Sequence, residues 1–134
     1  MVVDTSALLA ILLDERERRS FNEAIEAAAT RVVSAATFVE VSIVVESRFG
    51  AEGLRDLDRL IDRAKVEVAA VDLEQANLAR LAFSRFGKGR HPAGLNFGDC
   101  FSYALAVARS EPLLYKGEDF ALTDVARVTP LSQL

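Results

Sequence analysis

Short apolar runs alternate along the chain with longer stretches in which apolar residues recur at helical spacing. The apolar runs show little of the polar alternation expected of a half-exposed strand, so they are typical of strands that are buried on both faces. They predict strands at residues 1–4, 31–35, 66–71 and 112–115, with a last short strand at 126–131. Strands that alternate with helices indicate an α/β fold, a three-layer α/β/α sandwich with a central parallel sheet.

The amphipathic stretches between these runs predict helices at residues 5–13, 15–29, 36–50, 52–65, 72–89 and 96–109. Thr5 or Ser6 is available as the N-cap of the first helix, and Asp72 as that of the fifth. Gly50 is expected to end the third helix as a C-terminal cap. The inward faces of the third and fifth helices are predicted to carry Phe38, Val41, Val45 and Phe49, and Leu78, Leu81, Ala82 and Phe86.

The composition fits a single compact domain over residues 1–134, with 51% hydrophobic and 27% charged residues. No apolar run reaches the roughly 18 residues that a membrane span needs, and the N-terminus has no signal-peptide pattern, so a cytoplasmic location without membrane contact is expected. One cysteine and one histidine exclude an internal disulfide and an ordinary structural zinc site. The net charge of −4 argues against nucleic-acid binding by the whole surface, but not against an acidic cleft with a basic rim.

Four carboxylates are predicted to meet at the edge of the sheet where the parallel strands end. Asp4 ends the first strand, and Asp119 follows the fourth strand after four residues. Glu40 lies early in the helix after the second strand, and Asp99 early in the helix before the fourth. Each acid alone has an ordinary explanation: a helix cap for Asp4, a helix-edge acid for Glu40, a first-turn acid for Asp99 and a turn residue for Asp119.

Taken together, four acids at one edge would repel each other unless a cation neutralised them. Ligands that are all oxygen atoms select a hard ion, Mg²⁺ or else Mn²⁺. Such an ion can lower the pKa of a water, orient it and offset charge on a phosphodiester in the transition state. Four basic residues before Asp99 and Asp119 are candidates for holding RNA phosphates, although each is also explained as part of a solvated loop: Lys88, Arg90, His91 and Lys116.

Four stretches in this order, "VVDTSAL", "ATFVEVSIVVESRFG", "GKGRHPAGLNFGDCFSYALA" and "PLLYKGEDF", give the chain a clear likeness to a known family. From end to end it resembles the PIN-domain ribonucleases of the VapC toxin type. The resemblance implies a homodimer that cleaves RNA endonucleolytically with Mg²⁺ or Mn²⁺ and is held in check by a cognate antitoxin.

The resemblance also implies roles for individual residues. Asp4 and Asp99 match the principal metal ligands, while Glu40 completes the site directly or through a water. Asp119 matches a more variable fourth acidic position. Ser6 and Asn96 match polar positions that orient the acids. The apolar faces of the helices at residues 35–66 suggest a dimer contact there.

Other readings of the same sheet are weaker. An aspartyl phosphatase would need a second acid where Ser6 stands, and a phosphotransfer receiver would need an aspartate ending a middle strand where Val71 stands. Cys100 has no evident activating group for nucleophilic catalysis. The remaining alternative is a catalytically silent PIN-like module that binds RNA or protein. Retention of mutually repelling acids argues against it.

Overall fold

The computed structural model describes residues 1–129, and a sheet of short parallel strands lies at its centre. The elements follow in the order β1 (Val2–Val3), α1 (Thr5–Leu12), α2 (Arg18–Ala27), β2 (Val32–Ser34), α3 (Ala35–Arg63), β3 (Glu67–Ala69), α4 (Leu73–Phe86), α5 (Phe97–Arg109), β4 (Leu113–Leu114) and the 3₁₀ turn η1 (Phe120–Leu122). The strand order in the sheet is β3-β2-β1-β4. The predicted parallel α/β fold is therefore confirmed.

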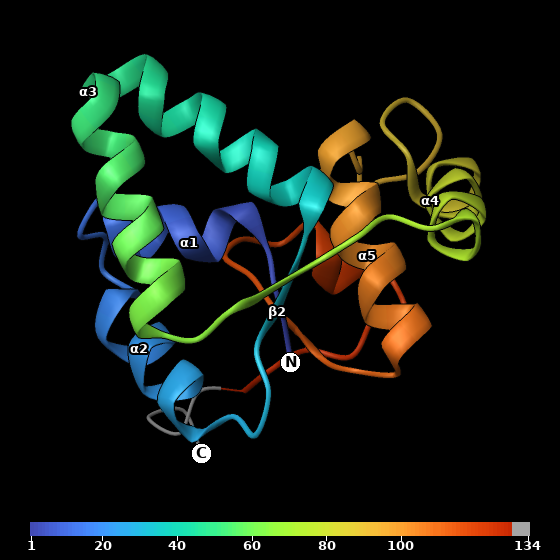
Figure 1. Ribbon diagram of the computed structural model, residues 1–134. Coiled ribbons are helices and arrows are strands. Elements are labelled where there is room, and N and C mark those ends of the chain that lie inside the picture. Colours follow the sequence, from blue (N-terminus) through green and yellow to red (C-terminus); the bar gives the residue numbers. More distant parts are fainter. Residues whose placement is uncertain (130–134) are drawn as a thin grey trace.

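Helices cover both faces of the sheet because neighbouring residues of each strand point to opposite sides. Val2, Val32 and Leu113 pack into a core with α4 and α5, whereas Val3, Val33 and Leu114 pack into a second core with α1, α2 and α3. In Figure 1 the helices of the first half of the chain and the pair α4–α5 accordingly lie on opposite sides of β2. This is the predicted three-layer arrangement.

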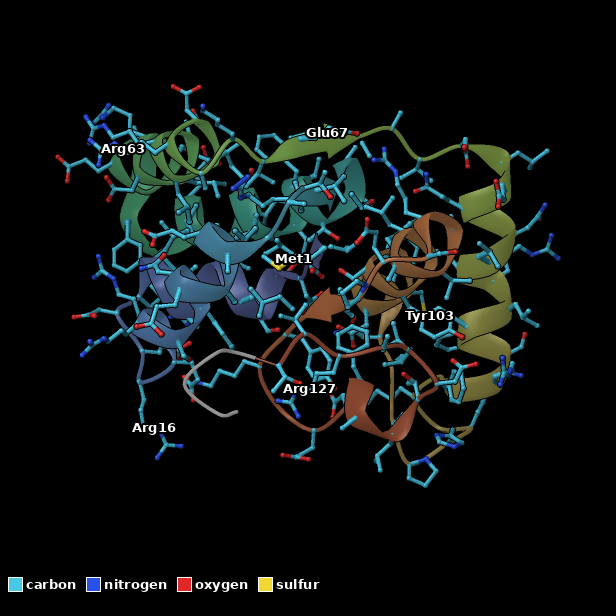
Figure 2. All side chains as sticks on the ribbon, turned by 90° about the horizontal axis from the view of Figure 1, so that it is seen from below. Met1, Arg16, Arg63, Glu67, Tyr103 and Arg127 are labelled. Carbon is cyan, nitrogen blue, oxygen red and sulfur yellow. The ribbon has the colours of Figure 1, made fainter. Side chains whose placement is uncertain are left out.

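Figure 2 shows the side chains on the ribbon in a view from below. Met1 lies near the centre and is 5% exposed, while Arg16 and Arg63 project from the periphery. Tyr103 of α5 packs its ring against Phe86 of α4 at a centroid distance of 5.8 Å.

None of the helices in residues 1–129 is long and apolar enough to cross a membrane.

The long helix α3 contains the predicted break at Gly50, whose φ of 64° and ψ of −148° are not helical. Two helical arms meet there, as Figure 1 shows at the upper left. Val41 and Val45 of the first arm are buried as predicted, and Leu57 of the second arm is buried too, but Phe49 is 55% exposed. Glycine suits this position because a positive φ carries no Cβ penalty for it.

Several local predictions were wrong. Thr5 and Ser6 do not cap α1; Asp4 does, as its ordinary explanation had it, because its carboxylate accepts the Ser6 N–H. The helix predicted at 15–29 begins only at Arg18, after a turn in which Asp14 has a φ of 53°. On α4, Leu81 is 52% exposed instead of buried.

The last predicted strand, at 126–131, was also wrong in the part that the structure describes. Arg127 there makes a single isolated bridge to Leu113. Residues 130 and 131 of that prediction lie outside the described residues.

Candidate active site

The predicted acids come from four segments that reach the same edge of the sheet. Asp4 directly follows β1, the strand between β2 and β4. Glu40 lies in the second turn of α3, which leaves β2, and Asp119 follows β4 at the start of η1. In a parallel sheet, ligand crevices lie beyond the carboxyl ends of the strands, where connections diverge to opposite faces. The order β3-β2-β1-β4 puts such a point at β1, and hence at Asp4.

Asp4 is buried, with 3% of its surface exposed, and its carboxylate is held on both oxygens. Oδ2 accepts hydrogen bonds from the Ser6 backbone N–H at 3.0 Å and from the Ser6 hydroxyl at 2.7 Å. The Lys116 backbone N–H donates in turn to Ser6 Oγ at 3.0 Å, which ties the chain after β4 to the start of α1. The predicted role of Ser6 in orienting this acid fits these contacts.

The other oxygen of Asp4 is held by a buried hydroxyl that the sequence did not single out. Ser102 of α5 donates to Asp4 Oδ1 at 2.6 Å, and its Oγ lies 3.1 Å from Thr37 Oγ1 of α3. Ser102 is 0% and Thr37 1% exposed. This chain of hydroxyls, which we call the hydroxyl ladder, joins α3, α5 and the end of β1 and leaves the carboxylate one fixed orientation.

Glu40 is half-buried and also held by a neighbour that the sequence analysis missed. The Thr5 hydroxyl of α1 donates to Glu40 Oε1 at 2.5 Å, so that the segments after β1 and β2 are linked beside Asp4. Thr5 could have been found as a hydroxyl next to a predicted ligand. Ser102 stands three residues after Asp99, on the same side of a helix, which is also a usable signal. Nothing in the sequence pattern points to Thr37.

Asp99 is the third residue of α5 and takes part in a complete capping box. Its backbone N–H donates to Asn96 Oδ1 at 2.9 Å, and its Oδ2 accepts the Asn96 N–H at 3.0 Å. Partial burial, together with the charges of Asp4, Glu40 and Asp119, raises the pKa of Asp99 from 3.8 to about 6, against the lowering effect of the Asn96 hydrogen bond. The structure thus brings all four predicted acids close enough for the other three to disfavour ionisation of Asp99.

The donor set fits a hard divalent ion. Within residues 1–129 no three acid, histidine or cysteine side chains are grouped tightly enough to enclose a metal by themselves. Mg²⁺ does not require such a cage, since it usually keeps several waters and takes one or two carboxylates plus substrate phosphates. Asp4 and Asp99 can supply those carboxylates: Asp4 Oδ1 accepts one hydrogen bond, from Ser102, and Asp99 Oδ2 accepts one, from Asn96, so each of these oxygens retains a further lone pair.

The four predicted RNA-binding residues differ in their surroundings: some are paired with other groups and some are exposed. The Lys116 ammonium lies 3.2 Å from Glu15 Oε2 and 3.3 Å from Glu17 Oε2, and hydrogen bonding to Glu15 and then Glu17 raises its pKa against the effect of desolvation. His91 Nδ1 accepts the Ala93 N–H at 3.0 Å. Lys88 and Arg90 are exposed on the loop between α4 and α5. RNA binding by these four residues stays a prediction.

The fold, a parallel sheet between two helical layers with acids from four segments at its carboxyl edge, and the sequence together assign the chain to a known class of protein. The family described as "PIN domain" matches residues 1–126. Solved structures share the fold. Mycobacterium tuberculosis VapC20, a sarcin-ricin loop cleaving toxin, gives a TM-score of 0.77 at 17% identity over 96% of this chain and 98% of that one. The toxin-antitoxin complex from Klebsiella pneumoniae gives 0.68 at 20% identity, covering 96% of each chain.

Sequence comparison identifies the branch of the family. The chain is 56% identical over 128 residues to Ribonuclease VapC of Mycolicibacterium smegmatis, covering 96% of this chain and 99% of that protein. It is 52% identical to Ribonuclease VapC30 of Mycobacterium tuberculosis, covering 96% and 98%. The chain belongs to the VapC ribonucleases of the PIN-domain family, the toxin components of toxin–antitoxin systems. The resemblance seen in the sequence motifs is confirmed. Nucleases of this family are generally metal-dependent.

Proposed function

We propose that this chain hydrolyses RNA phosphodiester bonds endonucleolytically at the pocket formed by Asp4, Glu40, Asp99 and Asp119, with Mg²⁺ or Mn²⁺ held principally by Asp4 and Asp99. The observation that carries the proposal is the joining of these segments at one edge of the sheet: the residue after Asp4 donates to Glu40, and Ser102 of α5, one turn after Asp99, donates to Asp4. The raised pKa of Asp99, caused first by burial and also by the charges of the other three acids, agrees with it. The four carboxylates, which come from separate segments, repel one another. A bound divalent cation would convert that repulsion into attraction.

The protein's own groups have distinct tasks in this proposal. Asp4, clamped by Ser6 and by the hydroxyl ladder, presents a carboxylate that needs no reorientation when a ligand arrives. Such preorganisation lowers the activation barrier of the reaction, because the carboxylate was already oriented when the protein folded. Asp99 adds a second carboxylate whose backbone is fixed by the capping box. When bound, the ion supplies charge neutralisation for the phosphodiester and a lower pKa for the attacking water.

Glu40 and Asp119 complete the proposed pocket from opposite sides of β1. Glu40, oriented by Thr5, is placed to accept a hydrogen bond from a water that enters the site. Asp119 is exposed and has no cap hydrogen bond, so its carboxylate is free to move toward the other acids. We expect the loss of Asp119 to cost less activity than the loss of Asp4 or Asp99.

The same proposal includes the partners. RNA as the substrate is supported by the names of the similar VapC ribonucleases. A cognate antitoxin is supported by the related fold in the Klebsiella pneumoniae toxin-antitoxin complex. A homodimer and a cytoplasmic location remain proposals from the sequence. Val39 and Ile43, which are 55% and 60% exposed on the first arm of α3, are compatible with a dimer contact within residues 35–66.

The test is metal-dependent cleavage of structured RNA by the purified protein, in the presence of Mg²⁺, Mn²⁺ or EDTA. We expect fragments with either ion, none with EDTA, and none with Asp99→Asn, which keeps the side-chain shape. The matched control is Asp58→Asn, since Asp58 is an exposed acid on the second arm of α3. RNA binding without fragments under every condition would instead favour the silent binding module.

A further inference from the structure

Gly98, the second residue of α5, lies directly against the carboxylate of Glu40. A Cβ atom built on Gly98 would overlap Glu40 Oε2 and would lie 2.5 Å from its Cδ and 2.8 Å from its Oε1. All three atoms belong to the end of one side chain. Gly98 has no positive φ, so its backbone conformation does not by itself call for glycine. The space that a side chain would occupy is filled by the Glu40 carboxylate.

The Glu40 carboxylate is held in this space from its other side. Thr5 donates to Oε1, so the carboxylate lies between the start of α1 and the first turn of α5. The next residue after Gly98 is Asp99, whose pKa the Glu40 charge helps to raise. The missing side chain at position 98 therefore lets Glu40, from α3, approach the start of α5 and the acids there.

A second helical glycine provides a contrast. At Gly53 on α3, a Cβ would meet the backbone carbonyl of Val45, with the carbonyl carbon at 3.0 Å. Backbone atoms in a packed helix cannot move aside without disturbing the arms of α3. At Gly98 the obstructing atoms are the flexible end of a side chain, which can rotate away. Substitution at Gly53 should therefore disturb the fold, and substitution at Gly98 should mainly displace Glu40.

We propose that Gly98 is a positioning residue for the nuclease reaction: the absence of its side chain admits the Glu40 carboxylate to the acidic pocket. The inference rests on the proposed role of Glu40 in that pocket. A side chain as small as a methyl group at position 98 breaks the Thr5–Glu40 contact and removes the Glu40 charge from the neighbourhood of Asp99. The fold remains, because alanine is a better helix former than glycine.

The first measurement tests the contact by thermal unfolding in EDTA, with wild type, Gly98→Ala, Glu40→Ala and the double variant. Gly98→Ala should leave the melting temperature close to that of wild type, and should raise it clearly when Glu40 is already alanine. This non-additivity is the signature of two groups in contact. Gly53→Ala, the control for backbone strain, should lower the melting temperature. An equal effect of Gly98→Ala in both backgrounds would overturn the proposed contact.

The second measurement is kcat/KM for RNA cleavage with Mg²⁺. Gly98→Ala should lower kcat/KM by about 10-fold or more, the range found when a group that orients a metal site is lost. In a Glu40→Asp background, where the carboxylate is one methylene shorter, Gly98→Ala should cost much less. Full activity of Gly98→Ala would overturn the positioning role.

The two measurements separate this inference from the proposed function. If Glu40→Ala cleaves RNA as well as wild type, the role of Glu40 in the reaction fails, and Gly98 then has no catalytic consequence. The melting cycle would still report whether the two residues compete for the same space. If Glu40→Ala is inactive and Gly98→Ala is active, the proposed function stands and the inference about Gly98 fails.

Discussion

Asp4 and Asp99 each combine two roles that the sequence presented as alternatives. Asp4 caps α1 through the Ser6 N–H, and Asp99 closes the capping box at the start of α5, yet both belong to the same group of four neighbouring acids. The roles are compatible because a carboxylate has two oxygens with two lone pairs each. A helix start also provides a positive dipole end that stabilises the negative charge. The capping contact of each acid is therefore compatible with its proposed role as a metal ligand.

Removal of one hydroxyl of the hydroxyl ladder tests whether the ladder orients Asp4. Ser102→Ala removes the donor to Asp4 Oδ1 and leaves the buried Thr37 hydroxyl without this neighbour. We expect a loss of about 1 kcal/mol in the free energy of unfolding. We also expect a roughly 10-fold drop in kcat for RNA cleavage with little change in KM. Urea unfolding and steady-state cleavage measure the two effects. Ser102→Thr should restore much of kcat, and an unchanged kcat in Ser102→Ala would show that Asp4 needs no such support.

The raised pKa of Asp99 makes the metal-free protein sensitive to pH. Because the native pKa of about 6 lies above the ordinary 3.8, the native state holds this proton more tightly than the unfolded state between those values. The contribution of Asp99 to stability therefore falls as pH rises through this window, and stays low above it. Asp99→Asn lacks this titration.

In EDTA, the melting temperature of Asp99→Asn should exceed that of wild type at about pH 7.5, and the difference should shrink toward about pH 4.5. The comparison with Asp99→Asn cancels the titration of carboxylates that lie far from the four acids. A constant difference across this range would contradict the raised pKa of Asp99.

At the scale of elements, the site depends on where helices begin and bend. The start of α5 carries Asp99, and Ser102 one turn later, while the first arm of α3 carries Thr37 and Glu40 toward them. Gly50 ends that arm, and the second arm leaves at an angle to the first (Figure 1), with Gly53 close to the Val45 carbonyl near the break. The helices thus act as rigid supports that hold side chains from distant segments at fixed separations.

The capping box at the start of α5 should contribute to both stability and activity. Asn96→Ala removes the acceptor for the Asp99 N–H. We expect a cost of about 1 kcal/mol in the free energy of unfolding, the usual value for a lost N-cap. Because the first turn then frays more easily, Mg²⁺-dependent cleavage should fall as well. Asn96→Ser, which retains a capping oxygen, is the matched variant. Equal stability of the alanine and serine variants in urea unfolding would contradict the capping role.

At the scale of the whole molecule, the sheet collects charges that are far apart in the sequence. Its two cores hold β1 between β2 and β4. Because these strands are parallel, the acids that follow them lie at the same edge of the sheet. Burial of about thirty hydrophobic residues supplies the favourable free energy that holds mutually repelling groups together. The folded protein therefore tolerates a local strain, the repulsion among the four carboxylates, that a bound cation can relieve.

Relief of this strain predicts stabilisation by metal. Ligands that bind only the native state raise the free energy of unfolding by RT ln(1 + [L]/Kd), about 2.7 kcal/mol at 100 times Kd. Millimolar Mg²⁺ or Mn²⁺ should therefore raise the melting temperature by several degrees, and Asp99→Asn should weaken that rise. Removal of Asp4 should weaken it too, but would also cost the α1 cap. Absence of any shift in differential scanning fluorimetry would argue against the metal site.

The sequence by itself determined the α/β/α class, the meeting of four acids at one edge of the sheet, the helix start at Asn96 with Asp99 in its first turn, and the break at Gly50. These features are local: hydrophobic periodicity, helix-start spacing and the backbone freedom of glycine act over a few residues. The same local signals did not decide between Thr5, Ser6 and Asp4 for the cap of α1, because all three are good capping residues.

Only the tertiary structure decided how the segments meet. The contacts of Ser102 with Asp4 and of Gly98 with Glu40 span separations of 98 and 58 residues, and such contacts leave no periodic trace in the chain. The exposure of Leu81 and Phe49 was likewise set by which helix faces found a neighbour. Burial and hydrogen bonding between distant segments depend on how the layers pack around the sheet. For that reason the tertiary structure reveals them and the sequence pattern does not.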